Sequence, residues 1–262
     1  MAVPRVGVAK AGEAYLDQWR AVRGCLGSLS RDAWLAPTVV DGWRVVELVA
    51  HLGLVARSVA SALAAPSRER PLGLAEYLAR YADVREAIGA RTGEAGDAPP
   101  ERVLEQVDAA AAAAEVAIEA AVVAGGDPTV AAGRGPVRAS DHLVSRCVEL
   151  VVHADDLARS AEVGPELRRP ALQLAVRGLA GVLEERAPGR SVEVRVPPFA
   201  AVQCIAGPRH TRGTPPAVVE TDPTTFLRVA TGRLTWADAQ GVGLVRASGL
   251  RTDLSPWFPL LR

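Results

Sequence analysis

The first 160 residues consist of amphipathic helical segments separated by loops rich in Gly, Pro and Asp. Apolar residues recur at helical spacing through 12–29, 43–65, 74–90, 101–124 and 140–158, and none of these stretches alternates as a strand does. Helices of this kind bury their apolar stripes against one another. The pattern therefore predicts a helical bundle with no β-strand before residue 160.

The pattern changes near residue 164. One more helix is expected at 170–186, with a proline in its first turn. Short β-rich runs follow, separated by Pro and Gly clusters: SVEVRVP, AAVQCIA and PAVVET. We also predict a short helix at 223–230, a strand at 244–248, and packing of Trp257 and Phe258 on the sheet.

These two patterns predict two domains. Residues 1–163 would form a mainly α bundle, and residues 164–262 a small α+β domain. We expect the two to fold as separate units.

Composition excludes several classes of partner. The 30 basic and 30 acidic residues give a formal net charge of zero, so we expect no nucleic acid partner. The apolar run Ala109–Ala124 contains Glu115 and Glu119, which argues against stable membrane insertion. The N-terminus lacks the apolar core of a signal peptide, and the three cysteines are scattered. We therefore expect a cytoplasmic protein.

Glu149 and His153 are the most informative pair in the bundle. At positions i and i+4 of one helix, their side chains project from the same face and can share a divalent metal ion. The alternative is a polar pair on an amphipathic helix. A third ligand elsewhere decides between the two.

His51 is the candidate third ligand. It lies on the second long helix between apolar neighbours, where a histidine without a metal would be an ordinary core residue. If the bundle brings His51 opposite Glu149 and His153, two imidazoles and one carboxylate leave open positions on a metal, as in catalytic sites. His142, two turns before Glu149, is too far along the helix to share that metal. Cys147 is expected to be a small buried side chain.

Two motifs resemble the DinB-like metal-binding four-helix bundle, and in particular the mycothiol-dependent maleylpyruvate isomerase type. They are DGWRVVELVAHLG and RCVELVVHADDL, about a hundred residues apart. The resemblance implies one divalent metal, zinc in that family, held by His51, Glu149 and His153. It also implies supporting roles for Arg146 and Asp156, and mycothiol as the cosubstrate.

One position departs from the family pattern. Arg44 stands where the family often has Ser or Thr, three residues before Glu47, so the usual capping box is lost. Asp41 is a possible replacement cap.

The second half resembles a sterol-carrier-like domain through TDPTTFLRVATGRLTWADA. Within it, Arg228 and Arg233 are weak candidates for binding a substrate carboxylate, and we favour the interpretation that they are surface arginines.

Three functions fit these observations. The first is an enzyme, a metal-dependent isomerase or S-transferase acting on a small molecule with a low-molecular-weight thiol such as mycothiol. The second is a metal-stabilised scaffold whose C-terminal domain binds an apolar ligand. The third is a regulatory protein that keeps the bundle and its ligands. The chain has no P-loop, Rossmann fingerprint or Gly-x-Ser-x-Gly elbow that would suggest another enzyme class.

Overall fold

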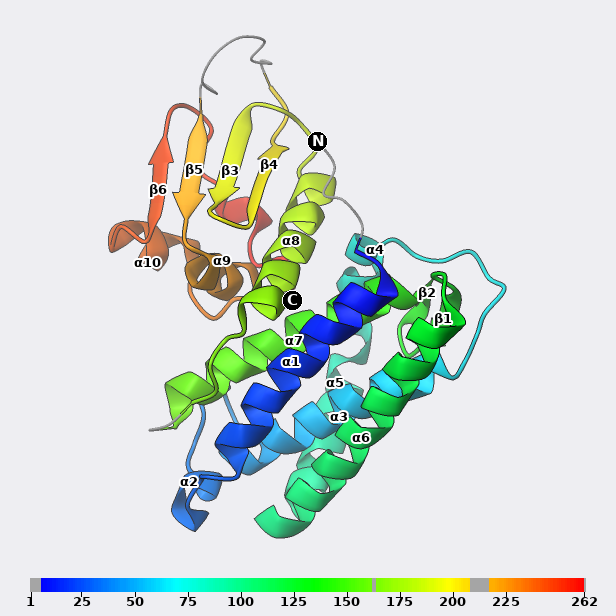
Figure 1. Cartoon of the computed structure of the whole chain (residues 1–262). Coiled ribbons are helices and arrows are strands. Elements are labelled where there is room, and N and C mark those ends of the chain that lie inside the picture. The colour runs from blue at the N-terminus through cyan, green and yellow to red at the C-terminus, as the bar shows by residue number, and fades with distance from the viewer. Residues whose placement is uncertain (1–5, 162–163, 208–216, 262) are drawn as a thin grey trace.

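The computed structural model describes residues 6–161, 164–207 and 217–261. It contains a helical N-terminal half and a mixed α+β C-terminal half with a four-stranded sheet (Figure 1). The predicted fold class is therefore confirmed. The long helices of the first half are α1 (Val8–Leu26), α3 (Val45–Leu63), α5 (Tyr81–Gly96), α6 (Pro100–Ala124) and α7 (Ala139–Ser160).

Helix α7 is the central element of the molecule. Almost every residue from Ala139 to Leu157 is buried, including four charged ones. The helix packs on α1 and α3 in the bundle and on α8 (Arg169–Arg186) of the second half. Its start is fixed by Asp127, whose carboxylate accepts hydrogen bonds from the Ser140 amide at 2.9 Å and hydroxyl at 2.8 Å.

Helix α3 begins with the residue that breaks the family pattern. Arg44 is its N-cap residue, and the Glu47 carboxylate accepts a hydrogen bond from the Arg44 amide at 2.8 Å while pairing with its guanidinium. Half of a capping box is thus kept without Ser or Thr. Asp41, which the sequence suggested as a replacement cap, lies three residues before the N-cap position.

Two of the expected boundaries in the bundle are wrong. The stretch expected as one helix at 74–90 is split into α4 (Leu74–Ala79) and α5, and α5 continues through the expected loop to Gly96. Gly96 is there for packing, because a Cβ atom on it would lie 2.6 Å from Glu47 Cγ. A short helix, α2 (Arg31–Leu35), was not predicted.

The prediction that the first 160 residues contain no strand is also wrong. Strands β1 (Thr129–Ala132) and β2 (Gly135–Arg138) form a hairpin whose turn is Gly133 and Arg134. Four-residue strands carry little sequence signal, and this hairpin depends on distant contacts. The Ala131 amide donates to Ala65 O at 2.7 Å, and the Leu72 amide donates to Pro136 O at 2.9 Å.

The second half is built on a mixed sheet in the order β4 (Ala200–Cys204), β3 (Val192–Val196), β5 (Val218–Thr221) and β6 (Val245–Ser248). Strands β3 and β5 are parallel, and the other pairs are antiparallel. Helices α9 (Pro223–Ala230) and α10 (Trp236–Gly241) and the 3₁₀ turn Ser255–Trp257 complete this half.

Aromatic packing closes the end of this half. Phe258 is buried and stacks on Trp236, with 5.6 Å between ring centroids, as its predicted packing requires. Trp257 is 37% exposed, so it is less buried than Phe258, and its packing on the sheet stays a prediction.

The two halves share one apolar core. Helix α8 packs on α1 and α7 on one side and on β4 on the other, and the buried apolar residues of both halves belong to one continuous cluster. Packing therefore does not support the expectation of two separately folding units. The sequence boundary at 163/164 stays a prediction, since residues 162 and 163 lie outside the described residues.

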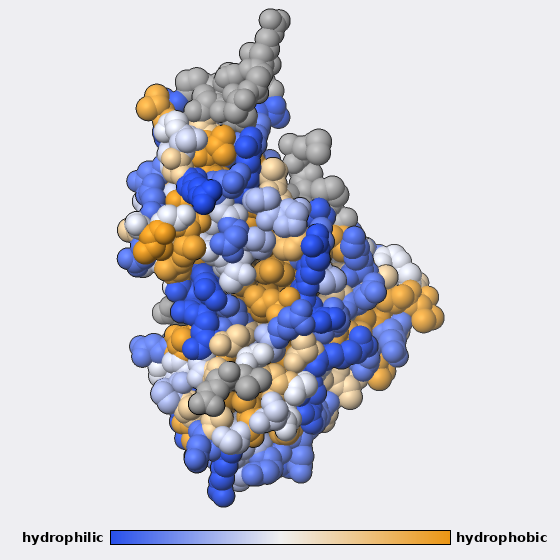
Figure 2. All heavy atoms as spheres, turned by 60° about the vertical axis from the view of Figure 1, so that its left-hand side comes forward, coloured by the Kyte–Doolittle hydropathy of each residue, from blue (hydrophilic) through white to orange (hydrophobic). Residues whose placement is uncertain are grey.

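Helix α3 is the one described helix that is long and apolar enough to cross a membrane, and most of it is buried in the bundle, which is typical of a core helix. On the face shown in Figure 2, hydrophobic residues form small separate groups among hydrophilic ones.

His142 joins α7 to α3 inside the core. Its Nε2 lies 3.1 Å from Ser58 O, which can only accept, so Nε2 carries the proton and Nδ1 accepts from the Tyr77 hydroxyl at 3.3 Å. Burial lowers the pKa of His142 to about 4.

We expect this buried neutral histidine to make stability depend on pH. Below an unfolded-state pKa of about 6.5, the unfolded chain gains a proton that the folded protein excludes until pH reaches about 4. The free energy of unfolding should therefore fall between pH 6.5 and 4, by up to about 3 kcal/mol from this group. Urea unfolding at several pH values measures it. His142→Gln, which keeps a donor for Ser58, should show a flatter profile, and an identical profile would contradict the assignment.

Candidate metal centre and the cavities beside it

The structure brings the three predicted ligands together. His51 lies on α3, and Glu149 and His153 lie one turn apart on α7, which packs against it. His51 Nε2 is 3.7 Å from Glu149 Oε2, and the rings of His51 and His153 are 4.8 Å apart between centroids. Within the described ranges, no three His, Cys, Asp or Glu side chains are already arranged to ligate a metal ion. The three ligands are thus close without forming a complete coordination shell.

The free atoms of this cluster fit a cation. His51 Nε2 and Glu149 Oε2 are both buried and have no hydrogen-bond partner. Partnerless buried polar atoms are costly, and a cation between these two would satisfy both. Two atoms that each lie about 2.1 Å from one zinc ion are at most about 4 Å apart, so the 3.7 Å separation is compatible with a shared ion.

Electrostatics keep the carboxylate charged. Burial alone raises the pKa of Glu149, but the Arg146 guanidinium, with Nη2 at 2.8 Å from Oε1, and the two histidines outweigh it and lower that pKa to about 2. Arg134 Nη2 also reaches Glu149 Oε1, at 3.5 Å. One oxygen is therefore held by arginines while the other faces His51. Arg146, a flanking residue of the motif, thus orients a ligand.

His153 is held as a neutral imidazole. Burial lowers its pKa to about 4, although the neighbouring Asp156 carboxylate acts to raise it. Its Nδ1 lies 3.0 Å from Asp156 Oδ2, so the proton sits on Nδ1 and the other nitrogen is left for a metal. The Trp43 ring flanks both histidines, at 5.2 Å from His51 and 6.2 Å from His153 between centroids.

Arg228 and Arg233 connect the second half to this site. Arg233 Nη2 donates to Asp156 Oδ2 at 2.9 Å, the oxygen that holds His153, and Arg228 pairs with Asp155 at 2.7 Å. The favoured interpretation of both as surface arginines is therefore wrong, and in this structure neither presents a free carboxylate clamp. Their partners lie more than seventy residues away, which no local pattern reveals.

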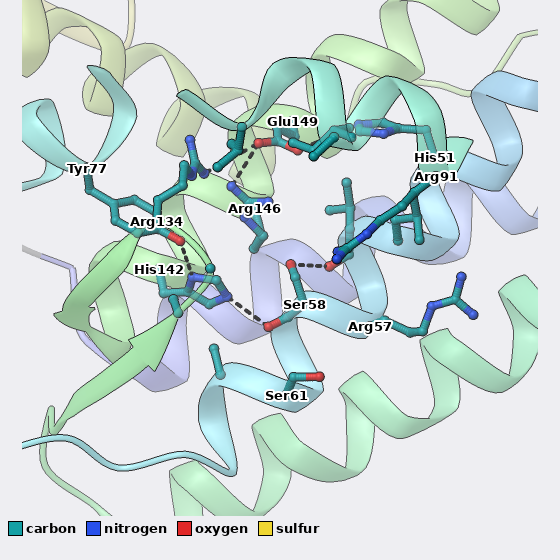
Figure 3. A pocket seen from close by; sticks show the side chains of 18 of the residues that line it. His51, Arg57, Ser58, Ser61, Tyr77, Arg91, Arg134, His142, Arg146 and Glu149 are labelled. Carbon is teal, nitrogen blue, oxygen red and sulfur yellow. Dashed lines mark hydrogen bonds and ion pairs between the residues drawn. The ribbon is translucent and has the colours of Figure 1, made fainter. Parts of the chain in front are cut away.

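Two cavities meet at the cluster. One of about 580 Å³ lies between α3, α5, α7 and the hairpin, and the residues labelled in Figure 3 line it. The other, of about 470 Å³, lies where the bundle meets the second half and is lined by Trp43, His153 and Arg233. Glu149 and Arg134 line both cavities. Sequence analysis missed Arg134, which is one of many arginines and lies in a turn without a motif.

The class of protein is a helical bundle with a buried His–Glu–His cluster, followed by a small domain-like half with a mixed sheet. Residues 15–158 match the family of the mycothiol maleylpyruvate isomerase N-terminal domain, and residues 168–260 match the family of bacterial SCP orthologs. The first match spans more than half of the sequence, so the chain belongs to the mycothiol maleylpyruvate isomerase N-terminal domain family.

Solved structures share the whole fold. A crystal structure of mycothiol-dependent maleylpyruvate isomerase matches with a TM-score of 0.61 at 16% identity, and a histidine-to-alanine mutant of that enzyme matches with 0.63 at 17%. Each match covers 93% of both chains. No curated protein sequence matches the chain significantly.

We expect the Asp156 carboxylate to control metal affinity. Asp156→Asn should weaken zinc binding by about 10- to 100-fold, because the His153 ring loses its charged partner. Arg233→Ala should have a smaller effect in the same direction, since it acts through Asp156.

Competition with a chromophoric chelator measures both effects, after elemental analysis has established about one metal per chain in the wild-type protein. Arg228→Ala is the matched control, because its partner Asp155 is not bonded to a predicted ligand. Equal zinc affinity in Asp156→Asn and the wild type would contradict the role of Asp156.

Proposed function

We propose that the protein is a divalent-metal-dependent enzyme that uses a low-molecular-weight thiol to isomerise a small organic substrate or to transfer the thiol to it. The observation that carries the proposal is the partnerless buried pair, His51 Nε2 and Glu149 Oε2, beside His153 and between two cavities. Family membership supports a metal and mycothiol, because the similar structures are those of a mycothiol-dependent isomerase. Zinc is the metal that the donor set favours.

The residues present suit the chemistry of thiol activation. His51, Glu149 and His153 would hold the metal, which when bound lowers the pKa of a coordinated thiol so that the thiolate forms at neutral pH. Arg146 and Asp156 fix the orientation of two of these side chains. The cavities on either side give the thiol and the substrate separate approaches.

Isomerisation needs no oxidant or reductant. The thiolate sulfur forms a bond to one carbon of a conjugated alkene, and the π electrons move onto the conjugated acceptor group. Rotation about the new single bond follows. Cleavage of the C–S bond then returns the thiolate and restores the alkene in the trans form. If the adduct instead takes a proton at carbon, the product is a thioether.

The protein's own cysteine at this helix does not supply the nucleophile. Cys147 is buried, its Sγ lies 3.7 Å from Ala171 O, and burial raises its pKa to about 12. A thiol of this kind stays protonated at neutral pH. Under this proposal, the thiol of the cosubstrate is the nucleophile.

The apolar-ligand scaffold is the less favoured function. Among the described residues, the space between the sheet and α9 amounts to about 10 Å³, bordered by Phe226, Trp236 and Phe258. That is room for about one water molecule. A lipid chain would require this core to open.

The proposal predicts a sharp contrast between two variants. With mycothiol and a panel of cis-alkenoic acids, His153→Ala should lose thiol-dependent turnover by more than about 100-fold, because a site with two ligands retains metal poorly. Cys147→Ser should keep most of the activity. Metal content and circular dichroism of both variants control for folding.

Two results would count against it. Loss of turnover in Cys147→Ser with metal still bound would point to a protein nucleophile. Absence of turnover with every thiol tested, in metal-loaded protein, would favour the scaffold or a regulatory role.

A further inference from the structure

The cavity between α3, α5, α7 and the hairpin is strongly basic. Four arginines line it, Arg57, Arg91, Arg134 and Arg146, whereas Glu149 is the one acidic residue among the described residues that do so. Arg146 is committed to Glu149 at 2.8 Å. Arg134 reaches the same carboxylate only at 3.5 Å, and no other acid among the described lining residues balances Arg57 and Arg91, which favours an anionic ligand.

Arg134 is the best-placed of these charges. Its side chain is 5% exposed, and its Nη1 is buried without a hydrogen-bond partner. Its contact with the Glu149 carboxylate is long, with 3.5 Å between Nη2 and Oε1. A buried guanidinium with a free N–H edge is unfavourable until an acceptor binds it.

The guanidinium is also held in position from behind. Its central carbon lies 4.3 Å from the centre of the Tyr77 ring, and the backbone carbonyl of Arg134 accepts a hydrogen bond from Arg80 at 3.4 Å. Stacking on an aromatic ring fixes the plane of the fork and so the direction of its free edge. Figure 3 shows Arg134 beside Tyr77, with Arg57 and Arg91 elsewhere around the same cavity.

Much of the remaining cavity wall is apolar, beside a few hydroxyl and imidazole groups. Leu54 and Val55 of α3 face Val84, Ala87 and Ile88 of α5 across a space of about 580 Å³. A ligand that suits this wall has an apolar body and one charged end. A neutral polyol could accept hydrogen bonds but would leave the positive charge of the arginines unbalanced.

We propose that Arg134 is the carboxylate-binding residue for a small organic acid with an apolar body, and that this acid occupies the cavity between α3 and α5. The inference rests on the proposed function only in treating this acid as the substrate, since the binding site itself requires neither metal nor thiol. The hairpin turn would then take part in substrate recognition. The thiol would bind in the other cavity, where the bundle meets the second half.

The test measures binding rather than turnover. Fluorine NMR gives the Kd of 4-fluorobenzoate for the protein as isolated, with 4-fluorobenzamide as the neutral probe of the same shape. We expect the benzoate to bind at least tenfold more tightly than the benzamide. Arg134→Gln should weaken benzoate binding at least tenfold and leave benzamide binding unchanged.

Arg138→Gln is the matched control, because Arg138 has the same charge and lies on the same hairpin but does not line the cavity. It should change the Kd of the benzoate by less than twofold. Unchanged benzoate binding in Arg134→Gln, an equal loss in Arg138→Gln, or no binding of benzoate to the wild type would each overturn the proposal.

A second measurement does not depend on the variant folding. In a crystal of the wild-type protein soaked with 4-bromobenzoate, the carboxylate should lie on Arg134, and the anomalous signal of bromine should lie against the apolar wall. Bromine in the other cavity alone, or on the outer surface alone, would overturn the proposal. The failure of thiol-dependent turnover would leave these results unaffected, so the two proposals fail separately.

Discussion

The buried charge of Glu149 is the interaction on which the rest of the site depends. A carboxylate in the middle of a core helix is unfavourable unless charged partners surround it. Arg146, one turn earlier on α7, satisfies one oxygen at 2.8 Å, and Arg134 approaches the same oxygen from the hairpin. The second oxygen faces His51 and has no partner. Because only one oxygen of Glu149 is paired with arginine, the other oxygen is available to bind a cation or a ligand.

The pairing of Glu149 with Arg134 requires the β1–β2 hairpin to be fixed in position. Arg134 reaches the core only because β1 and β2 are tied to the chain between α3 and α4 through backbone hydrogen bonds at Ala65 and Leu72. The hairpin in turn closes one side of the cavity beside α5. A loop residue is thereby placed with the accuracy of a core residue.

The helical framework and the common face of Glu149 and His153 were predicted well, because both follow from local periodicity. The approach of His51 to them does not follow from periodicity and was implied by the resemblance of two motifs to a known family. The i,i+4 spacing of Glu149 and His153 fixed their common face, and α9 begins and ends where it was predicted. Features that depend on distant contacts were missed: the hairpin, the continuation of α5 to Gly96, and the partners of Arg228 and Arg233. Gly96 is an example. A glycine in such a polar stretch is typical of a loop, but here it lies in a helix and permits close packing on Glu47. Metal binding by the three side chains stays a prediction.

The hydrogen bonds that the Asp156 carboxylate accepts from Arg233 and from His153 have a consequence for the second half of the chain. If His153 is a metal ligand as proposed, contacts that run from the second half to it link two equilibria, the packing of the halves on each other and the binding of the metal. Thermodynamic reciprocity then requires that whatever tightens one tightens the other by the same factor. Metal binding in the bundle would then strengthen the packing of the sheet-bearing half, and the two sites would be allosterically coupled.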